Sequence, residues 1–342
     1  MSVPSDKGAN AGFKVASLVA GMVAGADSID DMAMLRHGGM GRVFAKASKP
    51  STLGSFLRAF TFGHVRQLDA VASRFLTGLS VQAPMVVSSP GTAERVMLEI
   101  DDTIIEVHGY PRQGSGYGYS GVRGLNALLA VVSTTQSAPV IVAQRLRRGS
   151  CGSPRGAARP VADALKTLSH LTVDNTVRPL VRADSAYYGS PTIGAAIKGG
   201  ADVSVTGRLV VRRVPDLNTG TKNGQETLFD TWRFHAFFTT TDHDVADTVA
   251  ADNTQRGHAI IEQVHADLKH AAFAHLPSGK FTANAAGLVL AVMAHLLSTI
   301  PYVEVPPPTL ALPERPEPKG YERPPREQTA HVPDHCATLD RR

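Results

Sequence analysis

The feature that most constrains the fold is an acidic pair inside an apolar run, LEIDDTIIEVHGY, at residues 98–110. Alternate residues of a strand point to the same face, so Leu98 and Ile100 predict a strand with one face buried in a core. Asp101 and Asp102 follow directly in this run. Because buried or half-buried carboxylates are costly unless they are paired or bind a metal, the pair indicates chemistry at this strand.

Composition narrows the class of protein. The chain has 342 residues, enough for one large domain or two ordinary ones, and its 43% hydrophobic and 19% charged residues are typical of a soluble globular protein. A net charge of +5 mildly favours a polyanionic partner. Cys151 and Cys336 have no Cys or His at zinc-finger spacing. We therefore expect no disulfide framework, no zinc site and a reducing, cytoplasmic compartment.

Two apolar stretches resemble membrane signals. Residues 15–26 follow Lys14 and end in small residues, as a signal peptide does. Glycine dilutes this stretch, and its apolar spacing continues to Leu35 at helical periodicity, which favours an amphipathic helix. Residues 285–297 are too few to span a bilayer and include His295. No transmembrane segment is therefore predicted.

The first quarter of the chain has a helical pattern. Apolar residues recur every three to four positions over residues 13–79, and Ser51 and Thr52 are candidate N-caps. We expect a helical N-terminal region at 13–92, preceded by a disordered segment at 1–12. A DNA-binding role for the helical region stays open, because no recognition helix can be identified.

From residue 93 the pattern changes to strands alternating with helices. Residues 95–109 predict two short strands, or one strand bent at the acidic pair, and two further strands follow within 125–146. A helix at 157–171, a strand running into Asp184, a helix from Pro191 and a further strand come next. This order predicts an α/β fold, with a mixed sheet flanked by helices.

The remaining sequence divides by composition. We expect an α/β catalytic domain at 93–207 and 253–300, which ends in helices at 253–272 and 280–300, and a β-rich insertion at 208–252. Residues 301–342 contain much proline and few apolar residues, which predicts a disordered tail.

Three acidic residues occupy similar places in this pattern. Asp101 lies at the end of the first strand, Asp184 just after the strand VRPLVRA, and Glu262 within the helix at 253–272. Sites in α/β sheets form at strand ends, and a helix crossing that edge can add a third ligand. Carboxylates without a convergent His or Cys select Mg²⁺ or Mn²⁺, and a pair of such ions suits in-line attack on a phosphodiester.

Each of these acids has a second interpretation. Strand alternation puts Asp101 and Asp102 on opposite faces, so only one of them should bind a metal directly, and Asp101 is favoured. Asp184 could instead cap the turn that follows it. Glu262 could be an ordinary exposed helix residue, although its apolar neighbours argue against full exposure.

Three segments resemble a known family: LEIDDT at 98–103, LVRADSAYYG at 180–189, and RGHAIIEQVHADLKHAAFAHLPSGKFTANAAG at 256–287. The chain is similar over residues 13–297 to the Asp-Asp-Glu transposases of bacterial insertion sequences, and within them to insertion-sequence group thirteen-eighty. The resemblance implies an RNase H-like catalytic domain with a β-rich insertion before the last acidic helix. It also implies that Asp101, Asp184 and Glu262 form a catalytic, metal-binding triad.

The same resemblance suggests residues that contact DNA. Relatives in the wider superfamily carry Tyr, Arg and Lys on the helical face of the catalytic Glu. Lys269 matches the Lys and is expected to contact a transposon-end phosphate. His258 stands where the Arg would be, which departs from the pattern, and Arg256 could act instead. Arg212 and Arg213 fit a phosphate track as well as an ordinary solvated face.

The expected function is cut-and-paste DNA transposition. A phosphodiester at each transposon end would be hydrolysed with two Mg²⁺ or Mn²⁺ ions, and the freed 3′-hydroxyl would attack target DNA. The expected partners are double-stranded DNA, at terminal inverted repeats and target sites, and a second copy in a synaptic dimer at the bacterial nucleoid. The alternatives are a metal-dependent nuclease without strand transfer and an inactive DNA-binding remnant, because both ends look incomplete for this family. Trp232 is expected in the core, with stacking on a flipped base as the alternative.

Overall fold

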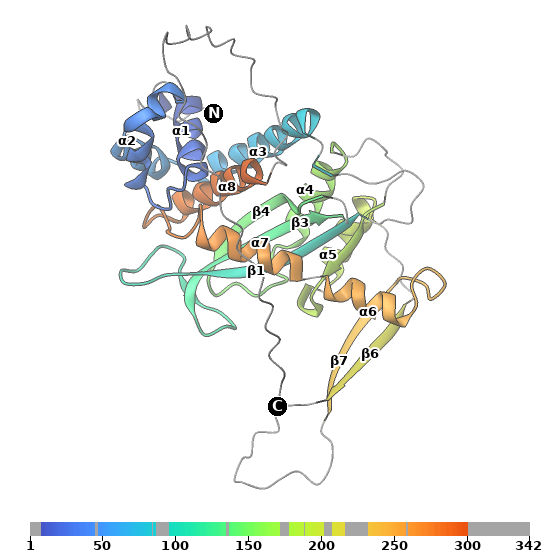
Figure 1. Cartoon of the computed structure of the whole chain (residues 1–342). Helices are drawn as coiled ribbons and strands as arrows, with labels where there is room; N and C mark the ends of the chain where they lie inside the picture. Colours follow the sequence, from blue (N-terminus) through green and yellow to red (C-terminus); the bar gives the residue numbers. More distant parts are fainter. Residues whose placement is uncertain are drawn as a thin grey trace, which may run out of the picture. The chain divides into compact units, whose positions relative to one another are not determined.

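The computed structural model describes most of the chain up to residue 299 (Figure 1). The described residues are 8–44, 47–83, 85–86, 96–134, 137–171, 178–187, 189–201, 207–215, 232–257 and 259–299. The predicted strand after residue 200 lies largely outside these ranges, as do His258 and the predicted tail at 301–342.

The N-terminal region is helical, as its periodicity predicts. Its α-helices are α1 (Ala11–Val23), α2 (Pro50–Arg58) and α3 (Phe62–Gln82), with 3-10 helices η2 (Asp31–Arg36) and η3 (Gly38–Arg42) between the first two. α1 begins two residues before the expected start at Phe13. The expected cap at Ser51 or Thr52 is wrong. α2 begins instead with Pro50, whose fixed φ suits the first turn of a helix.

A five-stranded mixed sheet forms the centre of the described fold. Its strands are β1 (Met97–Glu106), β2 (Gly116–Tyr117), β3 (Arg123–Ser133), β4 (Val140–Arg148) and β5 (Leu180–Ala183). β1 pairs antiparallel with β3 on one side and parallel with β5 on the other, while β2 and β4 both pair antiparallel with β3. The acidic pair lies within β1, which is one continuous strand rather than two.

Helices pack against both faces of the sheet. The contacts of two neighbouring β4 residues, Gln144 and Arg145, show which helices lie near each face. Gln144 Nε2 donates to Asp69 Oδ1 on α3 at 3.1 Å. Arg145 Nη2 lies 3.7 Å from Asp163 Oδ2 on α4 (Ala158–Leu168). Successive side chains of a strand point to opposite faces, so Gln144 and Arg145 mark the two faces of β4, and α4 lies on the Arg145 face. α3 lies along the edge of β4, where Arg66 Nη2 is 3.2 Å from Asp163 Oδ2 on α4.

The strand register shows which residues of β1 point to each of these two faces. Asp101 lies opposite Leu129, which lies opposite Gln144, so Asp101 is on the face to which Gln144 points. Asp102 is therefore on the α4 face. α7 (Ala259–His270) and α8 (Phe281–Ser298) lie on the Asp101 face, since α7 contacts β1 there and α8 packs against α3, α7 and β4. α5 (Ser190–Lys198) packs against α4 on the other face (Figure 1). The expected α/β class is confirmed.

The predicted helix at 253–272 is two helices, α6 (Thr248–Arg256) and α7. α6 ends at Gly257, where an added Cβ would lie 3.2 Å from Arg182 Nη1. The absence of a side chain at Gly257 lets the Arg182 guanidinium approach the backbone closely. The helix break therefore lies at a glycine, a residue type that commonly ends helices, beside the side chain of Arg182 on β5.

α8 is the core helix of the described fold. It is long and apolar enough to cross a membrane by length and composition, and 72% of it is buried inside the protein. It packs against α1, α2, α3 and β4. Burial by the protein's own elements accounts for its apolar composition, as expected for the core helix of a globular domain.

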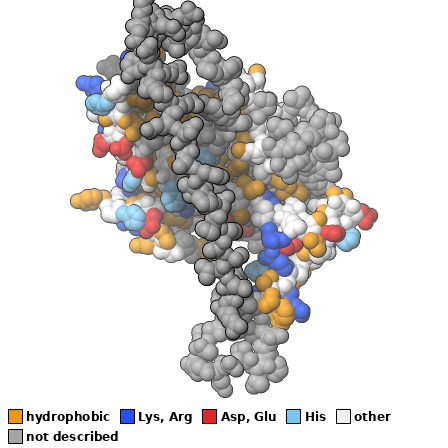
Figure 2. All heavy atoms as spheres, in the orientation of Figure 1, with side chains coloured by type: hydrophobic (Ala, Val, Ile, Leu, Met, Phe, Trp, Pro, Cys, Tyr) orange, Lys and Arg blue, Asp and Glu red, His pale blue; other side chains and the backbone are white. Residues whose placement is uncertain are grey.

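The strands of the expected insertion form a two-stranded hairpin, β6 (Arg208–Pro215) and β7 (Trp232–Thr239). One face contacts α6, through an Arg212 Nη1 to Asp252 Oδ2 distance of 3.4 Å. The other face is exposed, and Figure 2 shows hydrophobic side chains beside basic ones at this hairpin. Trp232 is 36% exposed, with its ring centroid 4.0 Å from Arg213 Cζ, so the expected core position is wrong.

Candidate active site

Asp101 and Asp184 lie at the same level of two neighbouring parallel strands. β1 and β5 pair with Ile100 beside Ala183, and the next step of this register sets Asp101 beside Asp184, the residue after β5. Neighbouring strands lie about 4.8 Å apart, and aligned residues of parallel strands point to one face. Asp101 is half-buried and Asp184 is exposed. The register thus brings two of the three predicted acids to one edge of the sheet.

Glu262 lies on α7, which runs alongside β1 (Figure 1). His265 Nδ1 lies 3.8 Å from Asp101 Oδ2, and Lys269 Nζ donates to Thr103 Oγ1 at 3.1 Å. Glu262 precedes His265 by three residues and Lys269 by seven, so the three side chains lie within about 60° of one another around the helix. The glutamate is exposed and lies on the same side of α7 as His265, the residue that contacts Asp101.

The three predicted carboxylates can be compared with the ligands that Mg²⁺ or Mn²⁺ prefers. Among the described residues, no three His, Cys, Asp or Glu side chains lie close enough together to hold a metal ion. Mg²⁺ keeps several water ligands, however, and is commonly bound by one or two carboxylates together with substrate phosphates. Asp101 and Asp184 supply two such carboxylates, and Glu262 lies on α7, the helix that contacts β1. This all-oxygen set fits Mg²⁺ or Mn²⁺ in its chemistry.

Asp102 is held differently, on the opposite face of β1. Its Oδ2 accepts a hydrogen bond from Asn126 Nδ2 and lies 3.3 Å from Arg147 Nη2, and its Oδ1 accepts from Tyr187 Oη. Only 13% of its side chain is exposed. Both carboxylate oxygens are therefore engaged by protein groups. This favours Asp101 over Asp102 as the metal ligand.

The groups around Asp102 form a buried polar network. Arg147 donates through Nε to Asn126 Oδ1 at 2.8 Å, and through Nη1 to the carbonyl oxygens of Ser153 and Arg155 at 2.8 and 2.9 Å. Burial, together with the hydrogen bond to Asp102, raises the pKa of Tyr187 far above its usual value. The phenol therefore stays protonated and serves as a donor.

A second buried contact lies on the Asp101 face. Glu99 and Arg182 form an ion pair across β1 and β5, with 0% and 7% of their side chains exposed. Ser133 Oγ donates to Glu99 at 3.0 Å, and Arg182 donates to the carbonyl oxygen of Thr254 near the end of α6. The pair ties β1 and β5 together and holds the end of α6 next to the acids.

The residues predicted to contact DNA occupy two places. Lys269 is half-buried beside β1, close to the acids. Arg256 and Arg212 both contact Asp252, with Arg256 Nε at 3.1 Å, and Arg213 lies against Trp232. The predicted basic residues of the hairpin are therefore engaged by neighbouring side chains, while Lys269 is the one that lies at the acidic edge.

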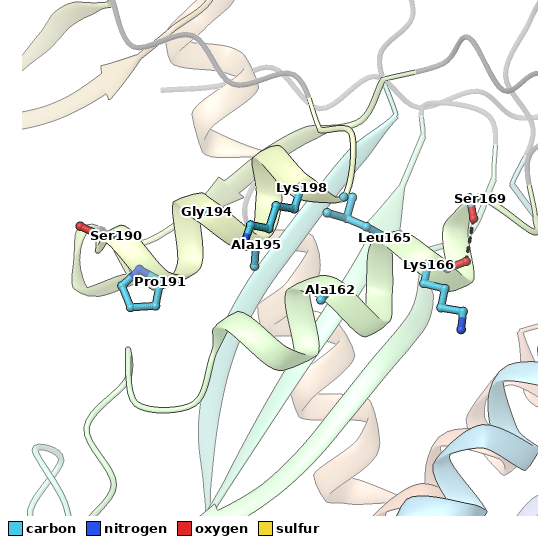
Figure 3. Close-up of a pocket in the computed structure, with 10 residues that line it drawn as sticks. Ala162, Leu165, Lys166, Ser169, Ser190, Pro191, Gly194, Ala195 and Lys198 are labelled. Carbon is cyan, nitrogen blue, oxygen red and sulfur yellow. Dashed lines mark hydrogen bonds between the residues drawn. The ribbon is translucent and has the colours of Figure 1, made fainter.

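A groove of about 550 Å³ lies between α4 and α5, on the face of the sheet opposite Asp101. Small and apolar residues such as Ala162, Leu165 and Ala195 line it, with Lys166 and Lys198 among them (Figure 3). It contains none of the predicted acids. The predicted acids therefore lie apart from this groove, and two of them, Asp184 and Glu262, are exposed.

Several residues of the site escaped the sequence reasoning. Glu99 and Arg182 each precede a predicted ligand by two residues, and strand alternation would have placed them on the same face as that ligand. His265 lies one turn after Glu262 and is buried, a position that helical spacing could have indicated. Asn126 and Arg147 carry no such signal, because their contacts to Asp102 depend on strand pairing.

The sequence of the sheet and its flanking helices matches a known protein family. Residues 92–297, more than half of the chain, match the family described as the transposase DDE domain. The chain belongs to this family. Members of a transposase DDE family act on DNA phosphodiesters, and the expected mixed sheet with flanking helices agrees with an RNase H-like DDE domain.

A second similarity concerns a short segment. The chain is 55% identical over 51 residues to the GDP-polyphosphate phosphotransferase of Mycobacterium tuberculosis (strain ATCC 25618 / H37Rv). This match covers 15% of this chain, which spans only 17% of the length of that relative. A match of that extent carries no argument for the relative's activity in this DDE transposase.

Proposed function

We propose that this chain is a DNA transposase of insertion-sequence group thirteen-eighty. It cleaves phosphodiester bonds at the terminal inverted repeats of its element and joins the freed 3′-hydroxyl ends to target DNA. Its partners are double-stranded DNA and a second copy of the chain in a synaptic dimer at the bacterial nucleoid. The helical region at 13–92 and the hairpin of the 208–252 insertion lie outside the sheet and are the proposed DNA-contacting parts.

The proposal assigns a role to each acid. Asp101 and Asp184 hold Mg²⁺ or Mn²⁺ at the open edge of the sheet, and Glu262 reaches the same ions from α7. Two such ions activate the attacking hydroxyl group and stabilise the leaving oxygen when bound. Lys269 lies beside this edge and contacts a DNA phosphate during the reaction.

One observation carries this proposal. β1 and β5 pair in parallel as far as Ile100 and Ala183, and Asp101 and Asp184 are the next residue of each chain segment, although they are far apart in sequence. A cation favours the ionised form of two carboxylates at neighbouring positions, so this alignment supports a role in binding a cation. The match of residues 92–297 to the transposase DDE domain supports the same chemistry.

The experiment is cleavage of a labelled duplex that carries the terminal inverted repeat, with Mg²⁺ present. Loss of one ligand removes several kcal/mol of transition-state stabilisation, so Asp101→Ala, Asp184→Ala and Glu262→Ala should each lower the cleavage rate by about 10³-fold or more. Glu106→Ala, an exposed acid at the end of the same strand, is the matched control and should cleave at the parent rate.

The products separate the proposed function from its two alternatives. Joined DNA in addition to cleaved ends supports transposition. Cleaved DNA without joined product would indicate a metal-dependent nuclease. DNA binding with no cleavage by the parent chain would indicate a binding remnant and would contradict the proposal.

A further inference from the structure

We propose that Tyr187 is a positioning residue for Asp184, and that it acts through Asp102. This inference rests on the proposed function, in which Asp184 binds a divalent metal ion. It concerns a residue that touches neither the metal ion nor the DNA. This role explains why Asp102, the neighbour of the proposed ligand Asp101, lies on the opposite face of β1 and is engaged by protein groups.

The first step is the turn that carries Asp184. β5 ends at Ala183, and the 3-10 helix η4 (Ser185–Tyr187) follows at once. The backbone N–H of Tyr187 donates to the carbonyl oxygen of Asp184 at 2.9 Å, which closes the turn. Asp184 is exposed, and this short turn continues its backbone beyond the strand. Its position therefore depends on what fixes the end of the turn.

The second step is the anchor of that turn. Tyr187 is 2% exposed, and its hydroxyl group donates to Asp102 Oδ1. Asp102 is the neighbour of Asp101 in β1. This hydrogen bond links the turn after β5 to the strand that carries the other predicted ligand.

The third step is the rigidity of the acceptor. Asn126 and Arg147 hold the other oxygen of Asp102, and both residues are buried, at 2% and 6% exposed. Arg147 is fixed in turn by the backbone carbonyl groups of Ser153 and Arg155. Groups that orient a metal ligand from behind typically change metal affinity 10- to 100-fold when they are removed. Tyr187 is therefore expected to set the spacing between Asp101 and Asp184.

The test measures Mn²⁺ binding to the full chain without DNA, from the electron paramagnetic resonance signal of free Mn²⁺. Tyr187→Phe removes only the hydroxyl group and should raise the half-saturating Mn²⁺ concentration about 10-fold. The melting temperature without metal should change little, and amide exchange at residues 184–187 should become faster. Tyr110→Phe, at a residue 91% exposed, is the matched control and should bind Mn²⁺ as the parent does.

Cleavage gives a second readout of the same role. The cleavage rate of Tyr187→Phe should fall at low Mg²⁺ and recover at saturating Mg²⁺, because the ligands are displaced and not lost. If Tyr187→Phe does not fold, Arg147→Lys is used. It keeps the charge but cannot bridge Asn126 and the two carbonyl groups, and it should raise half-saturation by a smaller factor. Unchanged half-saturation in that variant would overturn the proposal.

Two outcomes separate this inference from the proposed function. If Asp184→Ala abolishes Mn²⁺ binding while Tyr187→Phe keeps the parent half-saturation, the positioning role is wrong and the metal site stands. If Asp184→Ala binds Mn²⁺ as the parent does, both the ligand assignment and the positioning role are wrong.

Discussion

Glu99 and Arg182 form a buried ion pair on the same face of the sheet as Asp101 and Asp184, two residues earlier in each strand. Buried charges are stable only when they are paired and hydrogen-bonded, and here Ser133 donates to Glu99 while Arg182 donates to the Thr254 carbonyl group. The pair lies directly behind the proposed ligands. It ties together the two strands that lead to these residues.

Loss of the Arg182 cation should therefore destabilise the fold. Arg182→Met leaves the Glu99 carboxylate buried without its counter-charge, and we expect the free energy of unfolding to fall by about 3–5 kcal/mol. Urea unfolding followed by circular dichroism measures this change. Arg256→Met, in an exposed ion pair with Asp252, should cost about 1 kcal/mol or less. Equal costs for the two variants would contradict the structural role of the buried pair.

Gly149 and Gly152 make a matched pair in the segment after β4. A Cβ at Gly149 would meet the backbone oxygens of Gly124 at 1.9 Å and Gly116 at 2.4 Å, whereas a Cβ at Gly152 would meet nothing within 4 Å. Backbone atoms cannot move aside as side chains do. Gly149→Ala should therefore destabilise the protein by about 3 kcal/mol or more, and Gly152→Ala should leave its melting temperature nearly unchanged. A tolerated Gly149→Ala would show that β2 and β4 do not approach as described.

His295 on α8 should make stability depend on pH. Burial lowers the pKa of His295 below 6.5, so the unfolded chain takes up a proton at this residue before the folded chain does. Stability from this group is present above pH 6.5 and is lost as pH falls from 6.5 toward the folded pKa. His295→Leu should flatten the stability profile on the acid side of pH 6.5, in chemical unfolding at several pH values. The exposed His243→Leu is the control, and a flattening of equal size there would refute this origin.

Lys269 should contribute to DNA affinity through charge. If it contacts one phosphate, Lys269→Gln should reduce the slope of log K against log salt by about 0.9, with a similar loss for any DNA sequence. Fluorescence anisotropy at several salt concentrations measures the slope. Lys166→Gln on α4, on the opposite face of the sheet, should keep the parent slope. The same slope for Lys269→Gln and the parent would remove Lys269 from the interface.

Much of the fold follows from local patterns. The alternation of apolar residues predicts β1, and the same alternation separates Asp101 from Asp102, whose side chains lie on opposite faces. Helical spacing predicts α3 and α8 and places Glu262 and Lys269 on one side of their helix. These features depend only on residues that are close together in the chain, so the sequence is sufficient to predict them.

Other features depend on contacts between distant segments. The break at Gly257 arises where Arg182 approaches the backbone, so helical periodicity alone predicts one helix where there are two. The network at Asp102 joins residues from β1, β3, β4 and η4, and no local pattern pairs them. Trp232 is half-exposed against Arg213 because it lies on a two-stranded hairpin, which has too little core to bury it.

The most direct test is anomalous scattering from crystals of the full chain soaked in Mn²⁺. The proposed site predicts an anomalous peak in contact with the carboxylates of both Asp101 and Asp184, and no such peak in crystals of Asp184→Ala. A Mn²⁺ ion bound at Asp102 instead, or ordered Mn²⁺ only at places away from this edge of the sheet, would contradict it.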